Sequence, residues 1–223
     1  MIELKNIEMT YDDNGTKINA LKLKNLKIKD GEKVAFIGSS GCGKTTLFNL
    51  ISGMLTPTKG SVIVEDIDIT TLKENERDLF RANHIGYIFQ DFNLFPDFTV
   101  LQNVVLPMSF SKRYSKNEME KEALAMLKRV GLENKKNQKV KTLSGGEKQR
   151  VAIARSIVNK PNVILADEPT GNLDYKNGAK IMELILQIAK EEKATLLVIT
   201  HNNSQLELFD RSENIEELNE AIK

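Results

Sequence analysis

The sequence has only one cysteine, almost no excess of charge of either sign, and no long apolar run. Because Cys42 has no second cysteine to pair with, no intrachain disulfide can form, and a reducing compartment is the simplest interpretation. Lys and Arg (32) balance Asp and Glu (31), which argues against a dedicated nucleic-acid binder. No window approaches the roughly 20 apolar residues of a spanning helix, and Met1–Lys5 carries no signal pattern, so we do not expect the chain to cross a membrane by itself.

What is present fits one globular domain with both helices and strands. The 223 residues are 40% hydrophobic and 28% charged, which excludes a disordered chain and a disulfide scaffold. Continuous apolar runs at 34–37, 163–166 and 196–200 are typical of parallel strands that are buried on both faces. Each run is followed by small, polar or charged residues. Since ligands bind at the carboxyl edge of such sheets, we expect the residues that follow the three strands to lie at one edge and to form the ligand site.

The remaining periodicities complete an α/β class prediction. We expect a partly antiparallel strand region at 2–28, strands at 61–69 and 85–89, and helices at 44–54, 116–130, 146–158 and 176–191. The segment that starts at residue 91 is richer in helix and is interpreted as an inserted helical subdomain.

A glycine-rich loop carries the strongest single signal. Residues 38–45 fit G-x-x-x-x-G-K-[ST] without a mismatch, directly after a predicted strand and before a predicted helix. In such a loop backbone N–H groups and the helix N-terminus face an anion, Lys44 reaches the β- and γ-phosphates, and the Thr45 hydroxyl can bind Mg²⁺. The predicted nucleotide-binding residues here are Gly38, Ser39, Ser40, Gly41, Cys42, Gly43, Lys44, Thr45 and Thr46. For Cys42 we favour a small residue where bulk is not tolerated over a redox role.

Acidic and imidazole side chains follow the other two apolar runs. Asp167 ends its strand and is placed to hold Mg²⁺, and Glu168 comes next and can act as general base on the attacking water. An exposed acidic turn is the alternative. His201 ends the third run, at the same predicted edge, and we assign it a hydrogen bond to the γ-phosphate, with a structural histidine as the alternative.

The residues 143–147, Leu-Ser-Gly-Gly-Glu, followed by Lys-Gln-Arg, resemble the signature motif of ATP-binding-cassette (ABC) proteins. Glu147 stands where the family usually has Gln. Gln90 resembles the Q-loop residue, 172–174 the D-loop, and His201 the switch histidine. Tyr11 resembles the aromatic side chain that stacks on adenine, with a core aromatic at a strand end as the alternative. The resemblance covers roughly residues 1–201 and makes Gln90 a catalytic and metal-binding residue.

The resemblance implies a P-loop NTPase fold with a mostly parallel sheet and an N-terminal antiparallel region. Its core would comprise 1–90 and 160–201, its helical subdomain about 91–159, and 202–223 would be an atypical acidic tail. It also implies an ATPase in which two copies close head-to-tail on two ATP molecules with Mg²⁺. Ser144, Gly145 and Gly146 would then bind the γ-phosphate held by the other subunit, since a helix N-terminus is an anion site.

Within the family, 90–99, 103–107 and 166–174 are most similar to the ATPase subunits of the lipoprotein-release (LolD) and macrolide-exporter (MacB) type. Such subunits work with a separate, FtsX-like polytopic permease at the cytoplasmic face of the inner membrane. The alternatives are an FtsE-like regulator of cell-wall hydrolysis at division, an exporter of heme, peptide or drug, and a soluble ABC ATPase that does not act in transport. No nucleic-acid partner is expected.

Apolar side chains concentrate in the segment 91–106, just after Gln90. They are Phe92, Phe95, Phe98, Val100, Leu101 and Leu106. A groove for a coupling helix of the permease and core packing of the helical subdomain explain them equally well. The basic run 135–141 is interpreted as a solvated face rather than a contact with anionic lipid.

The tail departs from the family, because the chain after His201 lacks the usual aspartate and the glycine-containing hairpin. The sequence leaves open whether the tail is shortened, helical or mobile, and whether a last strand forms.

Overall fold

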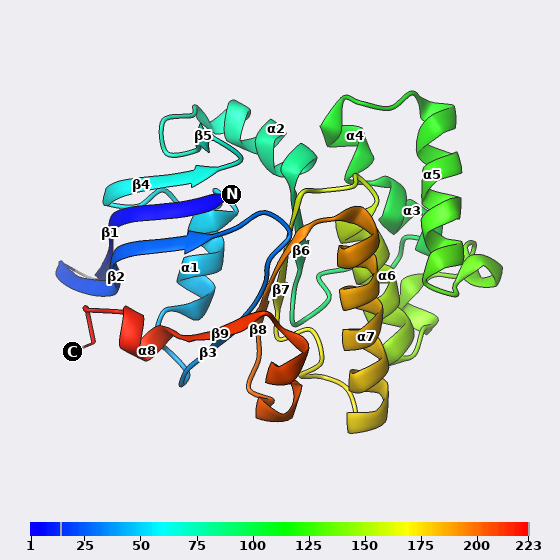
Figure 1. Cartoon of the computed structure of the whole chain (residues 1–223). Coiled ribbons are helices and arrows are strands. Elements are labelled where there is room, and N and C mark those ends of the chain that lie inside the picture. Colours follow the sequence, from blue (N-terminus) through cyan, green and yellow to red (C-terminus); the bar gives the residue numbers. More distant parts are fainter. Residues whose placement is uncertain (14, 223) are drawn as a thin grey trace. The chain divides into compact units, whose positions relative to one another are not determined.

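The computed structural model describes residues 1–13 and 15–222, which form two compact units. One unit comprises 1–78 and 195–223, and the other comprises 79–194. Figure 1 labels the helices and strands of both. The division into core, helical subdomain and tail given above stays a prediction.

An antiparallel sheet opens the first unit. Its strand order is β2-β1-β4-β5, with bounds Ile2–Asp13 for β1, Thr16–Ile28 for β2, Lys59–Val64 for β4 and Ile67–Asp68 for β5 (Figure 1). The prediction of a single strand at 61–69 is wrong in one respect. Glu65 and Asp66 have φ of +52° and +65°, so they form a left-handed turn that splits it into β4 and β5.

Parallel strands form the other half of the same unit. Strand β3 (Lys33–Ile37) pairs in parallel with β8 (Thr195–Ile199) and with β9 (Arg211–Asn214). Helix α1 (Lys44–Ile51) follows β3, and the short helix α8 (Ile215–Leu218) follows β9. The tail therefore supplies a last strand and one helical turn, preceded by a 3₁₀ segment at Asn203–Leu208. Side chains of β3 and α1 pack edge to face at Phe36 and Phe48, whose ring centroids are 5.9 Å apart.

The second unit holds the parallel pair β6 (Ile85–Ile88) and β7 (Val163–Asp167), with a group of helices. These helices are α3 (Val100–Val105), α4 (Met108–Ser111), α5 (Lys116–Arg129), α6 (Gly145–Ile157) and α7 (Tyr175–Glu192). Helix α2 (Glu74–His84) leads into β6. Helix α7 buries Ile181, Ile185 and Ile188 at helical spacing, as the sequence predicts.

The α/β class, the antiparallel N-terminal strands and the parallel strands are therefore as predicted. The predicted helices at 116–130, 146–158 and 176–191 form within a residue of their expected bounds. Helix α1 ends at Ile51, before Gly53, which has φ of +70°. Among the residues that the structure describes, no helix has the length and apolar character needed to span a bilayer.

Candidate functional site

The phosphate loop connects β3 to α1, and its backbone N–H groups are the donors available to an anion. Gly43 precedes the first helical residue with φ of +104°, and the first turn of α1 has no acidic residue. The Nζ of Lys44 donates to the carbonyl oxygens of Gly38 (2.8 Å) and Ser39 (2.7 Å), which folds the ammonium back over the loop. Ser39, Ser40 and Gly41 are exposed, so this part of the loop is open to a ligand.

The underside of the loop is tightly packed, and this explains its small residues. A Cβ at Gly43 would lie 2.9 Å from the carbonyl oxygen of Ala20, and a Cβ at Gly38 would lie 2.7 Å from the Sγ of Cys42. The Cys42 thiol is itself buried beneath the loop. This packing agrees with a small residue where bulk is not tolerated.

Three motif segments meet in the second unit around Glu168. The Nε2 of Gln90 donates to Oε2 of Glu168 at 3.2 Å, and the Nδ2 of Asn172 donates to the backbone carbonyl of Gln90 at 2.9 Å. The backbone N–H of Gly171 donates to the carbonyl oxygen of Glu168 at 3.0 Å. The segments that follow β6 and β7 are thus joined by two hydrogen bonds, one of which is accepted by the carboxylate that was predicted to be the base.

The backbone of Glu168 is strained. Its φ is +44°, in the left-handed region that a non-glycine residue rarely adopts and that costs backbone strain. Just before it, Asp167 ends β7 and accepts a hydrogen bond from the hydroxyl of Tyr87. Burial raises the pKa of Tyr87 above its usual value, and the Asp167 charge raises it further, so the hydroxyl stays protonated and orients this carboxylate.

The signature residues begin α6. Ser144 is the N-cap residue, and its backbone N–H and its hydroxyl both donate to Oε2 of Glu147 at 2.9 Å. An ion pair with Lys135 is the main cause that lowers the pKa of Glu147 to about 2, and the Ser144 N–H adds to it. Ser144 and Gly145 are exposed. The glutamate that departs from the usual family residue therefore serves as a capping carboxylate.

Part of the basic run 135–141 is ion-paired rather than only solvated. Lys135 contacts Glu147, and Lys141 contacts Asp97 at 2.7 Å. The latter pair is exposed to solvent, so it contributes little to stability.

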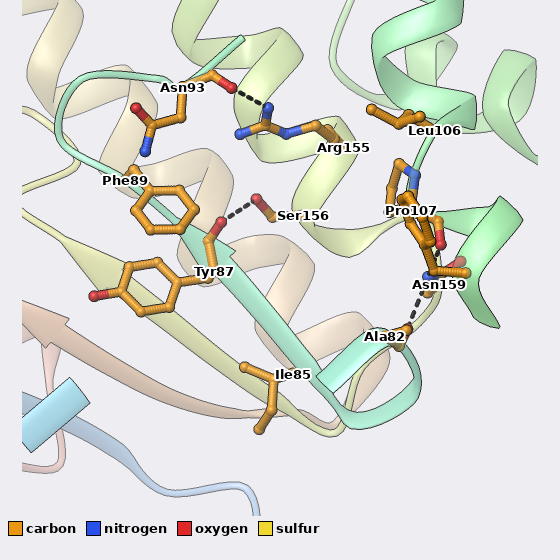
Figure 2. A pocket seen from close by; sticks show the side chains of 11 residues that line it. Ala82, Ile85, Tyr87, Phe89, Asn93, Leu106, Pro107, Arg155, Ser156 and Asn159 are labelled. Carbon is orange, nitrogen blue, oxygen red and sulfur yellow. Dashed lines mark hydrogen bonds between the residues drawn. The ribbon is translucent and has the colours of Figure 1, made fainter. Parts of the chain in front are cut away.

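A cavity of about 420 Å³ opens beside β6 in the second unit (Figure 2). It is lined by Ala82, Ile85, Tyr87, Phe89, Asn93, Leu106, Pro107, Phe110, Arg155, Ser156 and Asn159, and we call it the β6 groove. The guanidinium of Arg155 donates to the backbone carbonyls of Asn93 and Phe92 (2.8 Å to the latter), which fixes the segment after Gln90. Burial lowers the pKa of Arg155 to about 10, so it remains cationic at neutral pH.

The apolar residues predicted for this surface divide into different roles. Val100 is fully buried, which is core packing, and Leu106 lines the β6 groove. Phe95 and Phe98 are 47% and 40% exposed and stack at 5.1 Å, but they lie outside the groove lining. Sequence reasoning missed Arg155 and Tyr87, because each acts through a backbone or carboxylate partner distant in the sequence.

Four further predicted residues belong to the first unit. Tyr11 lies in β1 opposite Ile18 and is 38% exposed, as a stacking platform must be. Thr45 is exposed in the first turn of α1, and Thr46 follows it half-buried. His201 is exposed just beyond the end of β8.

A parallel strand, a glycine loop and a helix that opens with lysine and threonine define a P-loop nucleotide-binding fold. Residues 21–171 match the ABC transporter family, and the chain belongs to that family. It is an ATP-binding cassette and an ATPase, which confirms the resemblance drawn from the signature motif and the Q-loop.

The chain is similar to an uncharacterized ABC transporter ATP-binding protein of Methanocaldococcus jannaschii, MJ0796. The two are 46% identical over 205 residues, which is 91% of this chain and 87% of that protein. The lipoprotein-releasing system ATP-binding protein LolD of Syntrophus aciditrophicus is 40% identical over 212 residues, 95% of each chain. A solved dimeric structure of MJ0796 in a post-hydrolysis state with ADP and Pi has a TM-score of 0.88 and 43% identity, covering 96% of this chain and 94% of that one.

Proposed function

We propose that this chain is the ATPase subunit of a membrane complex of the lipoprotein-release type, working at the cytoplasmic face of the inner membrane. Two copies would close on two ATP molecules and drive a separate polytopic permease of the FtsX-like kind. One observation carries the coupling: Phe89 and Asn93, which flank Gln90 in the sequence, line the β6 groove, while Gln90 itself contacts Glu168. A partner seated in the groove can therefore act on the hydrolytic carboxylate.

ATP is bound by the phosphate loop in this proposal. Backbone N–H groups within residues 38–46 bind the phosphates, and Lys44 leaves the two carbonyls for the β- and γ-phosphate oxygens. Tyr11 stacks on the adenine, which its exposure supports.

The proposed Mg²⁺ ligands are Thr45, Gln90 and Asp167. They offer hydroxyl, amide and carboxylate oxygens, which are the hard donors that Mg²⁺ prefers. Because Nε2 of Gln90 is bound to Glu168, its amide oxygen is the ligand atom. Among the described residues no group of three or more His, Cys, Asp or Glu could hold a metal ion. A cation held by these residues would neutralise charge on the phosphates.

Hydrolysis is assigned to Glu168 and His201. Glu168 accepts a proton from the attacking water, and its strained backbone together with the contact from Gln90 fixes the direction of its carboxylate. His201 donates a hydrogen bond to the γ-phosphate, for which its exposure leaves room.

Ser144, Gly145 and Gly146 are assigned to the γ-phosphate bound by the second copy. We expect Ser144→Ala to lower hydrolysis by about 10- to 100-fold, because an oriented donor to the transferred group is lost, and to leave ATP affinity of the monomer within about twofold. The lost cap costs about 1 kcal/mol, which a melting curve detects. Ser109→Ala, at an exposed serine of α4, is the control. Equal loss of binding and hydrolysis would contradict a contribution from the second copy.

The partner proposed for the β6 groove is an intracellular helix of the permease that carries an acidic side chain. The apolar lining suits one face of a helix, and the cationic Arg155 favours a carboxylate.

Affinity purification of the tagged chain from detergent-solubilised membranes tests this function. We expect a polytopic FtsX-like protein to co-purify, and Leu106→Glu in the groove to reduce its yield at least tenfold with little change in melting temperature. Leu79→Glu is the matched control, since Leu79 is 38% exposed and lies outside the groove. Recovery of ribosomes or DNA without a membrane protein, or a yield unaffected by Leu106→Glu, would contradict the proposal.

A further inference from the structure

The acidic tail has no assigned role so far, yet it contacts the phosphate loop at two points. Oε1 of Glu216 accepts a hydrogen bond from the backbone N–H of Ser39 at 2.8 Å. Nδ2 of Asn219 donates to the backbone carbonyl of Cys42 at 3.0 Å. The two tail residues thus contact the loop at Ser39 and at Cys42, on either side of Ser40 and Gly41.

Asn219 is fully buried, and its side chain uses its whole hydrogen-bonding capacity. Nδ2 also donates to the carbonyl of Ala20 (3.0 Å), and Oδ1 accepts from the N–H groups of Lys22 (2.8 Å) and Ala221 (3.0 Å). The loop is therefore tied through one amide to β2. A buried amide with four partners is sensitive to any change, because each group left behind would be unsatisfied.

Glu216 is positioned by β9 and α8. Asn214, the last residue of β9, pairs with Ile37 just before the loop, and its Oδ1 caps α8 by accepting from the N–H of Glu216 at 3.0 Å. Hydrogen bonds from Ser39 are the main cause that lowers the pKa of Glu216, and Lys44 adds to it, so the side chain is a carboxylate acceptor at neutral pH. The Cγ of Glu216 would lie 3.7 Å from a Cβ at Gly38.

We propose that Glu216 and Asn219 are positioning residues for ATP binding, which hold the phosphate loop so that its remaining amide groups converge on the phosphates. The proposal rests on the nucleotide site assigned to residues 38–46 above. It predicts that the tail sets ATP affinity through hydrogen-bond geometry, not through its negative charge.

Four variants of the full chain test this, by calorimetry with Mg²⁺–ATP and by steady-state hydrolysis. We expect Glu216→Ala to raise the Kd and KM for ATP about tenfold with kcat unchanged, since one oriented hydrogen bond is lost. Glu216→Gln keeps an acceptor oxygen and is expected to restore the Kd to within about threefold. Asn219→Ala is expected to weaken binding further, and Glu207→Ala, which removes an exposed carboxylate from the 3₁₀ segment of the same tail, to change nothing.

The charge explanation is excluded if Glu216→Gln binds like the unchanged chain, and the proposal is overturned if it binds like Glu216→Ala. The pair at Glu216 keeps the test decisive even if Asn219→Ala fails to fold. Lys44→Ala distinguishes failure of the proposed role of the tail from failure of the nucleotide site. Loss of binding with Lys44→Ala but unchanged binding with Glu216→Ala and Asn219→Ala rejects only the role of the tail, whereas unchanged binding with Lys44→Ala rejects the nucleotide site.

Discussion

Replacing Glu168 by glutamine is expected to lower the rate of ATP hydrolysis by about 10²- to 10⁴-fold, the range that a positioned general base contributes. The amide oxygen of glutamine still accepts the hydrogen bond from Gln90, so the local structure is kept, but it cannot take a proton from water. ATP then persists between two copies, and the dimer accumulates.

Gel filtration and a phosphate-release assay with Mg²⁺–ATP measure both effects. Glu183→Gln is the matched control, because Glu183 is exposed on α7 in the same unit. Hydrolysis at the normal rate, with only monomer eluting, would reject both the base assignment and the closed dimer.

The phosphate loop and the signature were predictable from the sequence because each is a local motif. Gly38 and Gly43 precede α1 at positions where the backbone has positive φ, which glycine adopts readily. Ser144 caps a different helix, α6, three residues before Glu147. Such signals need no knowledge of which segments meet in space. The same locality explains why helices α5, α6 and α7 appear close to their expected bounds.

The tertiary contacts were not predictable in the same way. Arg155 holds carbonyls 62 and 63 residues away, and Asn219 holds one 177 residues away. Backbone carbonyls carry no sequence signature, so nothing in the pattern of residues marks their partners. The tail illustrates the consequence: its charge was visible in the sequence, but its contacts with the phosphate loop depend on β9 pairing with β3.

The contact of Gln90 with Glu168 was partly predictable from the sequence. Its two residues were each singled out by motif, and parallel pairing of β6 with β7 brings the ends of both strands together. Because Gln90 follows β6 and Glu168 follows β7, the topology alone makes them neighbours. The left-handed backbone of Glu168 was not predictable, since glutamate shows no preference for that conformation.

Lys44→Ala is expected to weaken ATP binding by about 100-fold or more, because the ammonium supplies charge-assisted hydrogen bonds to phosphate that nothing else in the loop replaces. In the structure this ammonium donates to the carbonyls of Gly38 and Ser39 and lies 3.9 Å from the Sγ of Cys42, all in the loop itself. We therefore expect a small change in the free energy of unfolding beside a large change in affinity. Calorimetric titration with Mg²⁺–ATP, alongside a denaturant melt, measures the two separately.

Lys59→Ala is the control for that experiment, since Lys59 is an exposed lysine of β4 in the same unit and pairs with Glu8 at 2.8 Å. Its removal tests whether loss of any positive charge from this unit weakens ATP binding. We expect an unchanged Kd, because an exposed charge is screened within about 8–10 Å at ordinary salt. If both variants lose affinity equally, the attraction is a general field effect, and Lys44 has no specific contact with the phosphates. If neither does, ATP binds elsewhere on the chain.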